Sequence, residues 1–291
     1  MSGIQTNRSN ISLPTAVSSE IIQKTQEDSA VMQLAEKTAL PGQGLTIPVV
    51  LSDPVAAWVG ETDRKPVSNP GLGTKVMRGY TLAVIEPFAN QFKRDYGSLY
   101  DALVKRLPRV LAKAFDETVF GAMEAPGSDF DQLSDATAQS LASDAYGGLV
   151  AADTDISLHG GLSNGYAISP QMRGILLSAV DKNDRPLFIN SVSEGAVDKI
   201  LGQPTYLTKG AFVSGSPSTI GYVGDWTKAK YGVVEGVSIT FSDQATLTLA
   251  DNSTINLFER NMFAVRAEIE IGFRADTSVF NKLTATSVPS I

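Results

Sequence analysis

The stretch SLYDALVKRLPRVLAKAFDETVFGAM, residues 98–123, carries the clearest structural signal in the sequence. Its apolar residues recur at spacings of three and four, which places them on one face of an α-helix. Ser98 followed by Asp101 resembles the capping box that starts many helices. The stretch therefore predicts a single helix of about 39 Å, in which Pro108 kinks the axis or removes one backbone hydrogen bond. The apolar positions are Leu99, Leu103, Leu107, Val110, Leu111, Ala114, Val119 and Ala122.

Upstream of this helix, two strand-like runs flank a polar segment. The runs are LTIPVVLSDPVAAWV at residues 45–59 and KVMRGYTLAVIEPF at residues 75–88. Together they predict a long hairpin whose tip cannot bury itself, and a two-stranded ribbon of this kind needs a surface to pack on. Residues 1–19 are rich in Ser, Thr and Asn and predict an arm that does not order itself alone. Residues 20–40 predict a short helix followed by an extended piece.

Downstream of the helix, the pattern predicts short helices and strands that alternate as far as residue 256. Ser169-Pro170 predicts a helix N-terminus, because serine is a good N-cap and proline suits the first helical position. Residues 265–273 alternate apolar with mostly charged side chains and form the best predicted strand. The other predicted helices are residues 131–146, stopped by Gly147-Gly148, and residues 193–201. The other predicted strands are residues 164–168, 205–207, 220–223, 233–241 and 245–249.

Composition excludes several classes of function. With 291 residues, 43% hydrophobic and 19% charged, the chain can bury a sizeable core and is not generally disordered. The net charge of -7 argues against a protein that wraps nucleic acid. The absence of cysteine, with His159 as the single histidine, excludes disulfides, thiolate chemistry and metal sites with two or more histidines, and we expect no cofactor. The N-terminus does not resemble a signal peptide, and no run of about 18 apolar residues predicts a membrane span.

The stretch DTDISLHGGLSNG, residues 153–165, is the one segment that resembles a catalytic constellation. It contains a Gly-x-Ser-x-Gly string around Ser163, as in the nucleophile elbow of some hydrolases. That elbow joins a strand to a helix, whereas we expect this stretch in a loop. In those hydrolases the histidine also follows the serine, whereas His159 precedes it. A glycine-rich polar loop is the favoured interpretation. A hydrolase using Ser163, His159 and either Asp153 or Asp155 is kept as an alternative that predicts a compact monomer.

Several short motifs gain meaning from their order along the chain. They are AAWVGE at residues 56–61, KPVS at 65–68, SP at 169–170, DKNDRPL at 181–187, LGQP at 201–204, GDW at 224–226, FERNM at 258–262 and FRAD at 273–276. Together with the long helix, they resemble the major capsid proteins of tailed double-stranded DNA phages, which have the Hong Kong 97-type shell fold. The resemblance covers about residues 20–285.

This resemblance implies an α+β fold with an N-terminal arm, an extended β-hairpin loop, a long spine helix, a peripheral domain and an axial domain. The arm and the start of the peripheral domain would occupy residues 1–44, and the extended hairpin loop residues 45–88. The peripheral domain with the spine helix would occupy residues 89–126. The axial domain would occupy residues 127–256, and residues 257–291 would return to the peripheral domain.

The implied function is structural and not enzymatic. Subunits of the family join as pentamers and hexamers into an icosahedral head that encloses double-stranded DNA without sequence-specific contact. The implied partners are further copies of the chain, a portal protein, a separate scaffolding protein and a decoration protein, with no membrane. The chain would be made in the host cytoplasm and end up in the virion. The alternative within the same fold is an encapsulin-like bacterial compartment that encloses cargo enzymes.

The resemblance also suggests which residues make the contacts between subunits. Acidic Glu61 and Asp63 of the loop are expected to pair with a neighbour's Arg106 or Arg109, around apolar contacts of Trp58. An approximate alignment puts Leu257 where some family members carry a cross-linking asparagine, so we expect no isopeptide cross-link. The expected assembly residues are Trp58, Glu61, Asp63, Arg64, Lys65, Lys75 and Arg78 of the loop, and Arg106 and Arg109 of the spine helix.

Overall fold

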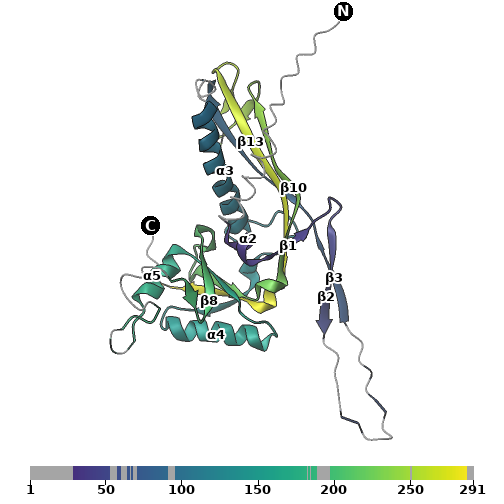
Figure 1. Cartoon of the computed structure of the whole chain (residues 1–291), viewed down its shortest axis with the longest axis vertical. Coiled ribbons are helices and arrows are strands. Elements are labelled where there is room, and N and C mark those ends of the chain that lie inside the picture. The colour runs from purple at the N-terminus through teal and green to yellow at the C-terminus, as the bar shows by residue number, and fades with distance from the viewer. Residues whose placement is uncertain are drawn as a thin grey trace, which may run out of the picture.

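The computed structural model describes residues 29–52, 58–59, 64–65, 67, 71–90, 96–181, 183, 185–188, 197–249 and 251–286. Within these residues the strands form two larger sheets and two separate two-stranded ribbons. One larger sheet has the strand order β1-β10-β13-β4 and lies beside the long helix α3 (Figure 1). The other has the order β5-β14-β9-β6-β8-β7 and carries helices α4 and α5. The fold is therefore mixed α+β, as predicted.

The four-stranded sheet and α3 form the elongated part of the molecule. The predicted long helix is confirmed, although it spans Tyr96–Val119 and ends four residues earlier than expected. It ends there because the chain turns at Gly121, which has a positive φ of 80°. Buried Leu107 and Leu111 pack in one cluster with apolar residues of the sheet. The strands are β1 (Glu36–Ala39), β10 (Ala229–Ser242), β13 (Met262–Ala275) and β4 (Tyr80–Ala89).

The N-terminal part of the described chain joins this sheet through a short helix. Helix α2 (Ala30–Leu34) starts after Ser29, whose hydroxyl accepts a hydrogen bond from the Met32 N–H. Strand β1 follows and pairs in parallel with β10. The predicted short helix followed by an extended piece is confirmed for the described residues.

The six-stranded sheet draws on widely separated parts of the chain. Helix α5 (Pro170–Ser178) begins as predicted, because the Ser169 hydroxyl accepts a hydrogen bond from the Met172 N–H. Helix α4 (Ala145–Leu158) packs against β14 and β5. The strands are β5 (Thr137–Ser140), β14 (Phe280–Ala285), β9 (Ser218–Gly224), β6 (Gly165–Ile168), β8 (Gln203–Leu207) and β7 (Lys199–Ile200).

The predicted helix over residues 131–146 is wrong. This segment holds a 3-10 turn, η2 (Leu133–Asp135), and strand β5, and helix α4 starts only after Asp144. Gly147 and Gly148 lie in the first turn of α4 and do not stop a helix. A Cβ at Gly147 would lie 2.4 Å from Asp144 Oδ2, and one at Gly148 would lie 2.5 Å from the Ser140 carbonyl oxygen. Close packing on the backbone of β5 therefore explains Gly148, whereas Gly147 meets only the movable carboxylate of Asp144.

Two further predictions need correction. The strand-like run at residues 75–88 divides at Arg78-Gly79 into β3 (Gly71–Met77) and β4, which belong to different sheets. The predicted helix at residues 193–201 is wrong where it is described, because residues 199–200 form β7. Leu201 and Gly202 then make a turn with φ angles of 48° and 83°. Residues 193–196 lie outside the described residues.

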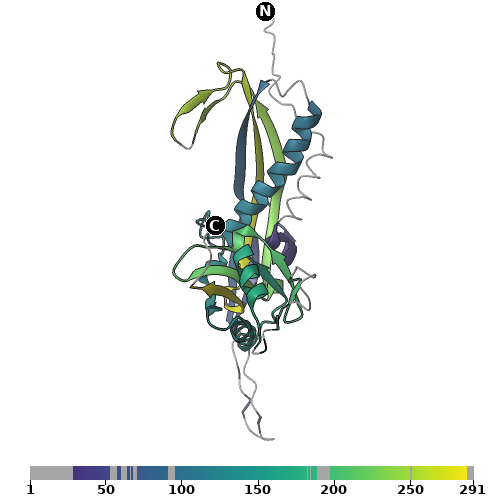
Figure 2. The same cartoon turned by 90° about the vertical axis from the view of Figure 1, so that its left-hand side faces the viewer.

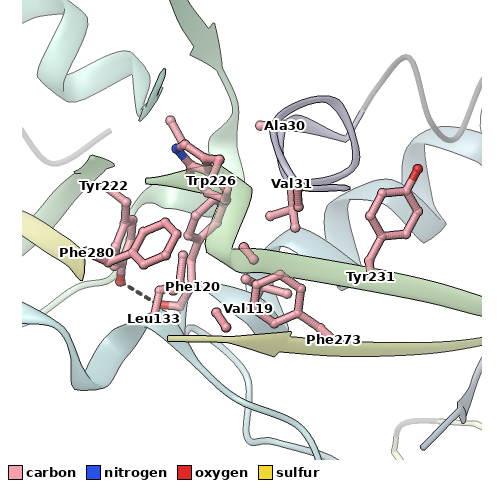
Figure 3. Packing of buried hydrophobic residues seen from close by; sticks show 14 of the residues in the cluster. Ala30, Val31, Val119, Phe120, Leu133, Tyr222, Trp226, Tyr231, Phe273 and Phe280 are labelled. Carbon is pink, nitrogen blue, oxygen red and sulfur yellow. Dashed lines mark hydrogen bonds between the residues drawn. The ribbon is translucent and has the colours of Figure 1, made fainter. Parts of the chain in front are cut away.

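One aromatic core joins the two larger sheets. Trp226 meets Phe280 edge to face with ring centroids 5.1 Å apart, and Phe120 stacks on Tyr222 at 4.8 Å. The Tyr222 hydroxyl also donates a 2.6 Å hydrogen bond to the Phe120 carbonyl (Figure 3). The domain boundaries at residues 127 and 256 stay a prediction. Strand β10 lies in the four-stranded sheet and β14 in the six-stranded sheet.

The two ribbons project from this body. Strands β2 (Leu45–Ser52) and β3 form the predicted hairpin, which points away from both larger sheets (Figure 1). Strands β11 (Thr246–Thr248) and β12 (Thr254–Asn256) form a second, smaller hairpin that curves away from the far end of the four-stranded sheet (Figure 2).

Candidate functional site

The β2–β3 hairpin and the segment beyond it hold most of the expected assembly residues. Trp58 is fully exposed to solvent, and Val67 is 85% exposed. Arg64 and Lys65 are exposed as well. The predicted partners Glu61 and Asp63 lie outside the described residues, so their pairing with a neighbouring helix stays a prediction.

The base of the hairpin carries a network of charged side chains, which we call the base cluster: Lys75, Arg78, Asp129, Asp131 and Arg274. Lys75 Nζ lies 3.2 Å from Asp131 Oδ2, and Arg78 Nε lies 3.3 Å from Asp129 Oδ2. Arg274 reaches both carboxylates, with Nη1 2.7 Å from Asp131 Oδ1 and Nη2 3.1 Å from Asp129 Oδ1. Two residues expected at a subunit contact thus form ion pairs within their own chain.

Sequence reasoning missed the two aspartates of the base cluster, and it placed Arg274 only in a motif. The aspartates follow α3 in the polar segment GSDFD, residues 127–131, which has no periodicity. The basic residues that pair with them lie 51 to 145 residues away along the chain. No local pattern could have revealed the network, because its members meet only through the sheet topology.

The spine helix presents its charges at the surface. Arg106 is 71% exposed and lies 3.6 Å from Glu86 of β4. An exposed ion pair of this kind contributes about 0–1 kcal/mol, so it holds Arg106 only weakly. Arg109 is also exposed. Both arginines expected to meet a neighbouring hairpin therefore lie on the accessible side of α3.

Helix α4 exposes an apolar face, formed by Tyr146, Val150 and Leu158 and continued by Leu162 beyond the helix. These side chains are 51%, 39%, 80% and 75% exposed. The opposite side of α4 is buried through Leu149, Ala152 and Ile156 (these belong to the core of the six-stranded sheet). Thr154, between Val150 and Leu158 on the same side, is exposed as well. Several large exposed apolar side chains along one helix suit a contact with another protein.

Asp116 of α3 is a buried carboxylate that joins three parts of the fold. Its Oδ1 accepts hydrogen bonds from Ser29 Oγ at 2.6 Å and from the Val31 N–H at 3.3 Å. Its Oδ2 accepts from the Ala30 N–H at 3.1 Å and from Thr208 Oγ1 at 2.9 Å. Burial raises the pKa of Asp116 to about 6, although these hydrogen bonds oppose the shift. The carboxylate thus ties the start of α2 and the end of β8 to the spine helix.

The residues of the hydrolase alternative do not assemble into a catalytic site. Asp153 and Asp155 lie in α4, not in the expected loop. Ser163 donates to the Asp153 carboxylate, whereas His159 Nδ1 lies 2.8 Å from the carbonyl oxygen and 3.7 Å from Oδ1 of Asp155. The serine and the histidine therefore have separate partners, and the alternative is not supported.

The described part of the chain carries neither a metal-binding group of side chains nor a membrane-spanning helix. No group of three or more His, Cys, Asp or Glu side chains there is placed to hold a metal ion. Within the same residues, no helix combines the length and apolar character required to cross a membrane.

Comparison with known proteins gives consistent matches over nearly the whole chain. The protein named "Probable major capsid protein gp17" of Mycobacterium phage L5 is 27% identical over 281 residues, covering 90% of this chain and 85% of the relative. The major capsid protein of Staphylococcus phage 80alpha is 25% identical over 278 residues, covering 90% and 82%.

Solved structures show the same fold. A structure from Gordonia phage Cozz superposes with a TM-score of 0.72 at 19% identity, covering 89% of this chain and 87% of that one. A structure titled as the capsid of a native GTA particle has a TM-score of 0.62 at 13% identity, covering 99% and 96%. The model of the phage capsid family matches residues 10–279. The chain therefore belongs to the phage capsid family.

Proposed function

We propose that the chain assembles through the β2–β3 hairpin and the apolar face of α4 into pentamers and hexamers that close an icosahedral head. Membership of the phage capsid family makes the chain a major capsid protein, a structural component of the virion and not an enzyme. The proposal adds which surfaces join the copies.

The observation that carries the proposal is the hairpin with the exposed Trp58 beyond it. A tryptophan side chain buries about 150–250 Å² of surface when it packs, and an exposed tryptophan does not contribute the favourable free energy of that burial. A second copy of the chain offers the missing surface, and the exposed Arg106 and Arg109 of its α3 would suit the acidic Glu61 and Asp63. Many repeated contacts of this kind supply the strength that one exposed ion pair lacks.

The apolar face of α4 supports a second contact, between axial domains within one pentamer or hexamer. Tyr146, Val150 and Leu158 carry no charge, so covering this face with an apolar surface of the neighbouring copy requires no ion on it to be desolvated. Burial of apolar area is the main favourable term in most association between proteins.

The contents and partners of the shell follow from the family resemblance. We propose that the head encloses double-stranded DNA without sequence-specific contact, in keeping with a subunit charge of -7. A portal protein, a separate scaffolding protein and a decoration protein are the proposed partners. The relatives named as phage capsid proteins favour this head over an encapsulin-like compartment.

Light scattering combined with negative-stain microscopy of the purified chain tests the proposal. Closed particles of megadalton mass are the expected result, and nuclease-protected DNA inside particles from infected cells would separate a head from a compartment. A chain that stays monomeric even with its scaffolding partner present would contradict the proposal.

A further inference from the structure

We propose that the base cluster fixes the direction in which the β2–β3 hairpin leaves the subunit, and thereby sets where the hairpin meets a second copy of the chain. This inference rests on the proposed function, because the direction matters only in an assembly. It assigns Asp129, Asp131 and Arg274 a positioning role, since they lie at the base of the hairpin and act through it.

The contacts that hold the direction of the hairpin lie at its base, where Met77 of β3 is also fully buried. Strands β2 and β3 pair only with each other and belong to neither larger sheet. The hairpin is joined to the body by residues 40–44 at one end and by Arg78-Gly79 at the other. A two-stranded ribbon alone is marginally stable in water, so contacts at its base decide how it is held.

Arg274 connects three segments at once. It lies near the end of β13, and its Nε donates a 2.8 Å hydrogen bond to the carbonyl oxygen of Val76 in β3. Its two terminal nitrogens reach Asp131 and Asp129, and its side chain is only 10% exposed. A planar guanidinium with all its nitrogens engaged fixes the relative orientation of its partners, which a single flexible ammonium does not do.

Lys75 ties the same segments together from the side of the hairpin. Its Nζ donates to the carbonyl oxygen of Ala275 at 3.0 Å as well as to Asp131. The Ala275 N–H in turn donates to Asp131 Oδ2 at 3.1 Å. Strand β3, the end of β13 and the loop after α3 are thus connected at several points, which restrains an angle better than one contact does.

Close backbone packing supports the same conclusion. A Cβ on Gly272 of β13 would lie 2.3 Å from the Arg78 carbonyl oxygen, and a Cβ on Gly79 would lie 2.5 Å from Val234 Cγ2. Since real Cβ atoms do not approach so closely, these positions need glycine as long as the hairpin keeps this direction. Arg78-Gly79, which follows β3, therefore packs closely against both β13 and β10.

Arg274→Lys tests the inference against the matched control Arg266→Lys. Both arginines lie on β13, but Arg266 pairs with Glu268 and does not belong to the base cluster. The chain has no cysteine, so cysteines introduced at the exposed Thr74 of β3 and the exposed Ser143 before α4 carry spin labels at unique sites. The label-to-label distance in unassembled subunits then reports the direction of the hairpin.

We expect Arg274→Lys to broaden or shift this distance distribution, and the unlabelled variant to lose closed particles in favour of open or irregular ones. Arg266→Lys is expected to match the parent chain in both measurements. If Arg274 only stabilises the fold, Arg274→Lys will lower the unfolding temperature while the distance stays narrow and the particles stay normal, which would overturn the inference.

A second variant covers the case in which Arg274→Lys does not fold. Asp129→Asn removes the ion pairs to Arg78 and Arg274 at a side chain that is 26% exposed, and we expect the same broadening. If the parent chain forms no shell, the proposed function fails, while the distance measurement still decides the role of the base cluster. If the parent assembles and both variants keep its distance and its particles, the inference alone fails.

Discussion

At the scale of single residues, Asp116 links the pH of the solution to the stability of the subunit. The unfolded carboxyl has a pKa near 3.8 and the folded one a pKa of about 6, so the folded chain binds this proton more tightly. The stability that this difference contributes is fully present below pH 3.8 and is lost as the pH rises through about 6. The folded chain is therefore less stable when Asp116 is ionised than when it is protonated, although four hydrogen bonds reach the carboxylate.

The corresponding prediction compares the parent chain with Asp116→Asn, which cannot titrate. When the pH is lowered from 7 to 5, the free energy of unfolding of the parent should increase by about 1 kcal/mol relative to that of the variant. Chemical unfolding of the unassembled chain at both pH values measures this difference. A constant difference between the two proteins would show that Asp116 does not titrate in this range.

Trp58 allows a second prediction at the same scale. Because its side chain is fully exposed, Trp58→Ala should leave the stability of the isolated chain within about 0.5 kcal/mol. The same change should lower the thermal stability of assembled particles, while Trp58→Phe, which keeps an aromatic ring, should retain most of it. Differential scanning calorimetry of both forms makes the comparison, and particles of unchanged stability would remove Trp58 from the interface.

At the scale of elements, α4 is the clearest candidate for a contact within one pentamer or hexamer. Leu158→Asp places a charge at the most exposed apolar position of this helix, and burying that charge in an interface without a partner is costly. We expect this variant to fold normally by circular dichroism but to form no closed particles. Leu158→Met is the control, and equal assembly of both variants would contradict the assignment.

The same helices show what the sequence can and cannot predict. Helix α3 was predictable because one face packs on a sheet while the other meets solvent, which gives a clear period. Helix α4 was missed because Gly147-Gly148 indicates a helix end, whereas both glycines lie in its first turn. Its apolar period is also weak, because Leu149 points inward while Val150 and Leu158 point outward. Because the proposed contact surface is apolar, α4 lacks the polar outer face opposite a buried face on which helix prediction depends.

The contacts at the hairpin base were hidden for another reason. The motifs that carried the family resemblance included Arg274, but its partners come from a different part of the chain. Lys75 and Arg78 belong to the loop residues expected at a contact between subunits. The structure pairs them within the subunit instead, and only the three-dimensional arrangement shows that they meet Asp129 and Asp131.

At the scale of the whole molecule, the shell should be held together without covalent links between subunits. Leu257, at the position expected for a cross-linking asparagine, is fully buried and offers no amide for an isopeptide bond. Particles boiled in detergent should therefore run as one band near 30.9 kDa in gel electrophoresis. A ladder of multiples of that mass would contradict this prediction.

The order of strands in the two larger sheets also determines when a newly made subunit can fold. Strand β13 lies between β10 and β4, and β14 lies between β5 and β9, although both come late in the chain. A nascent chain that has emerged as far as residue 256 therefore lacks an interior strand of each sheet. Long-range pairing of this kind cannot form until those residues leave the ribosome. Chains that are still being translated on one polysome consequently cannot yet join a shell. Assembly of subunits begins only after β13 and β14 have been synthesised.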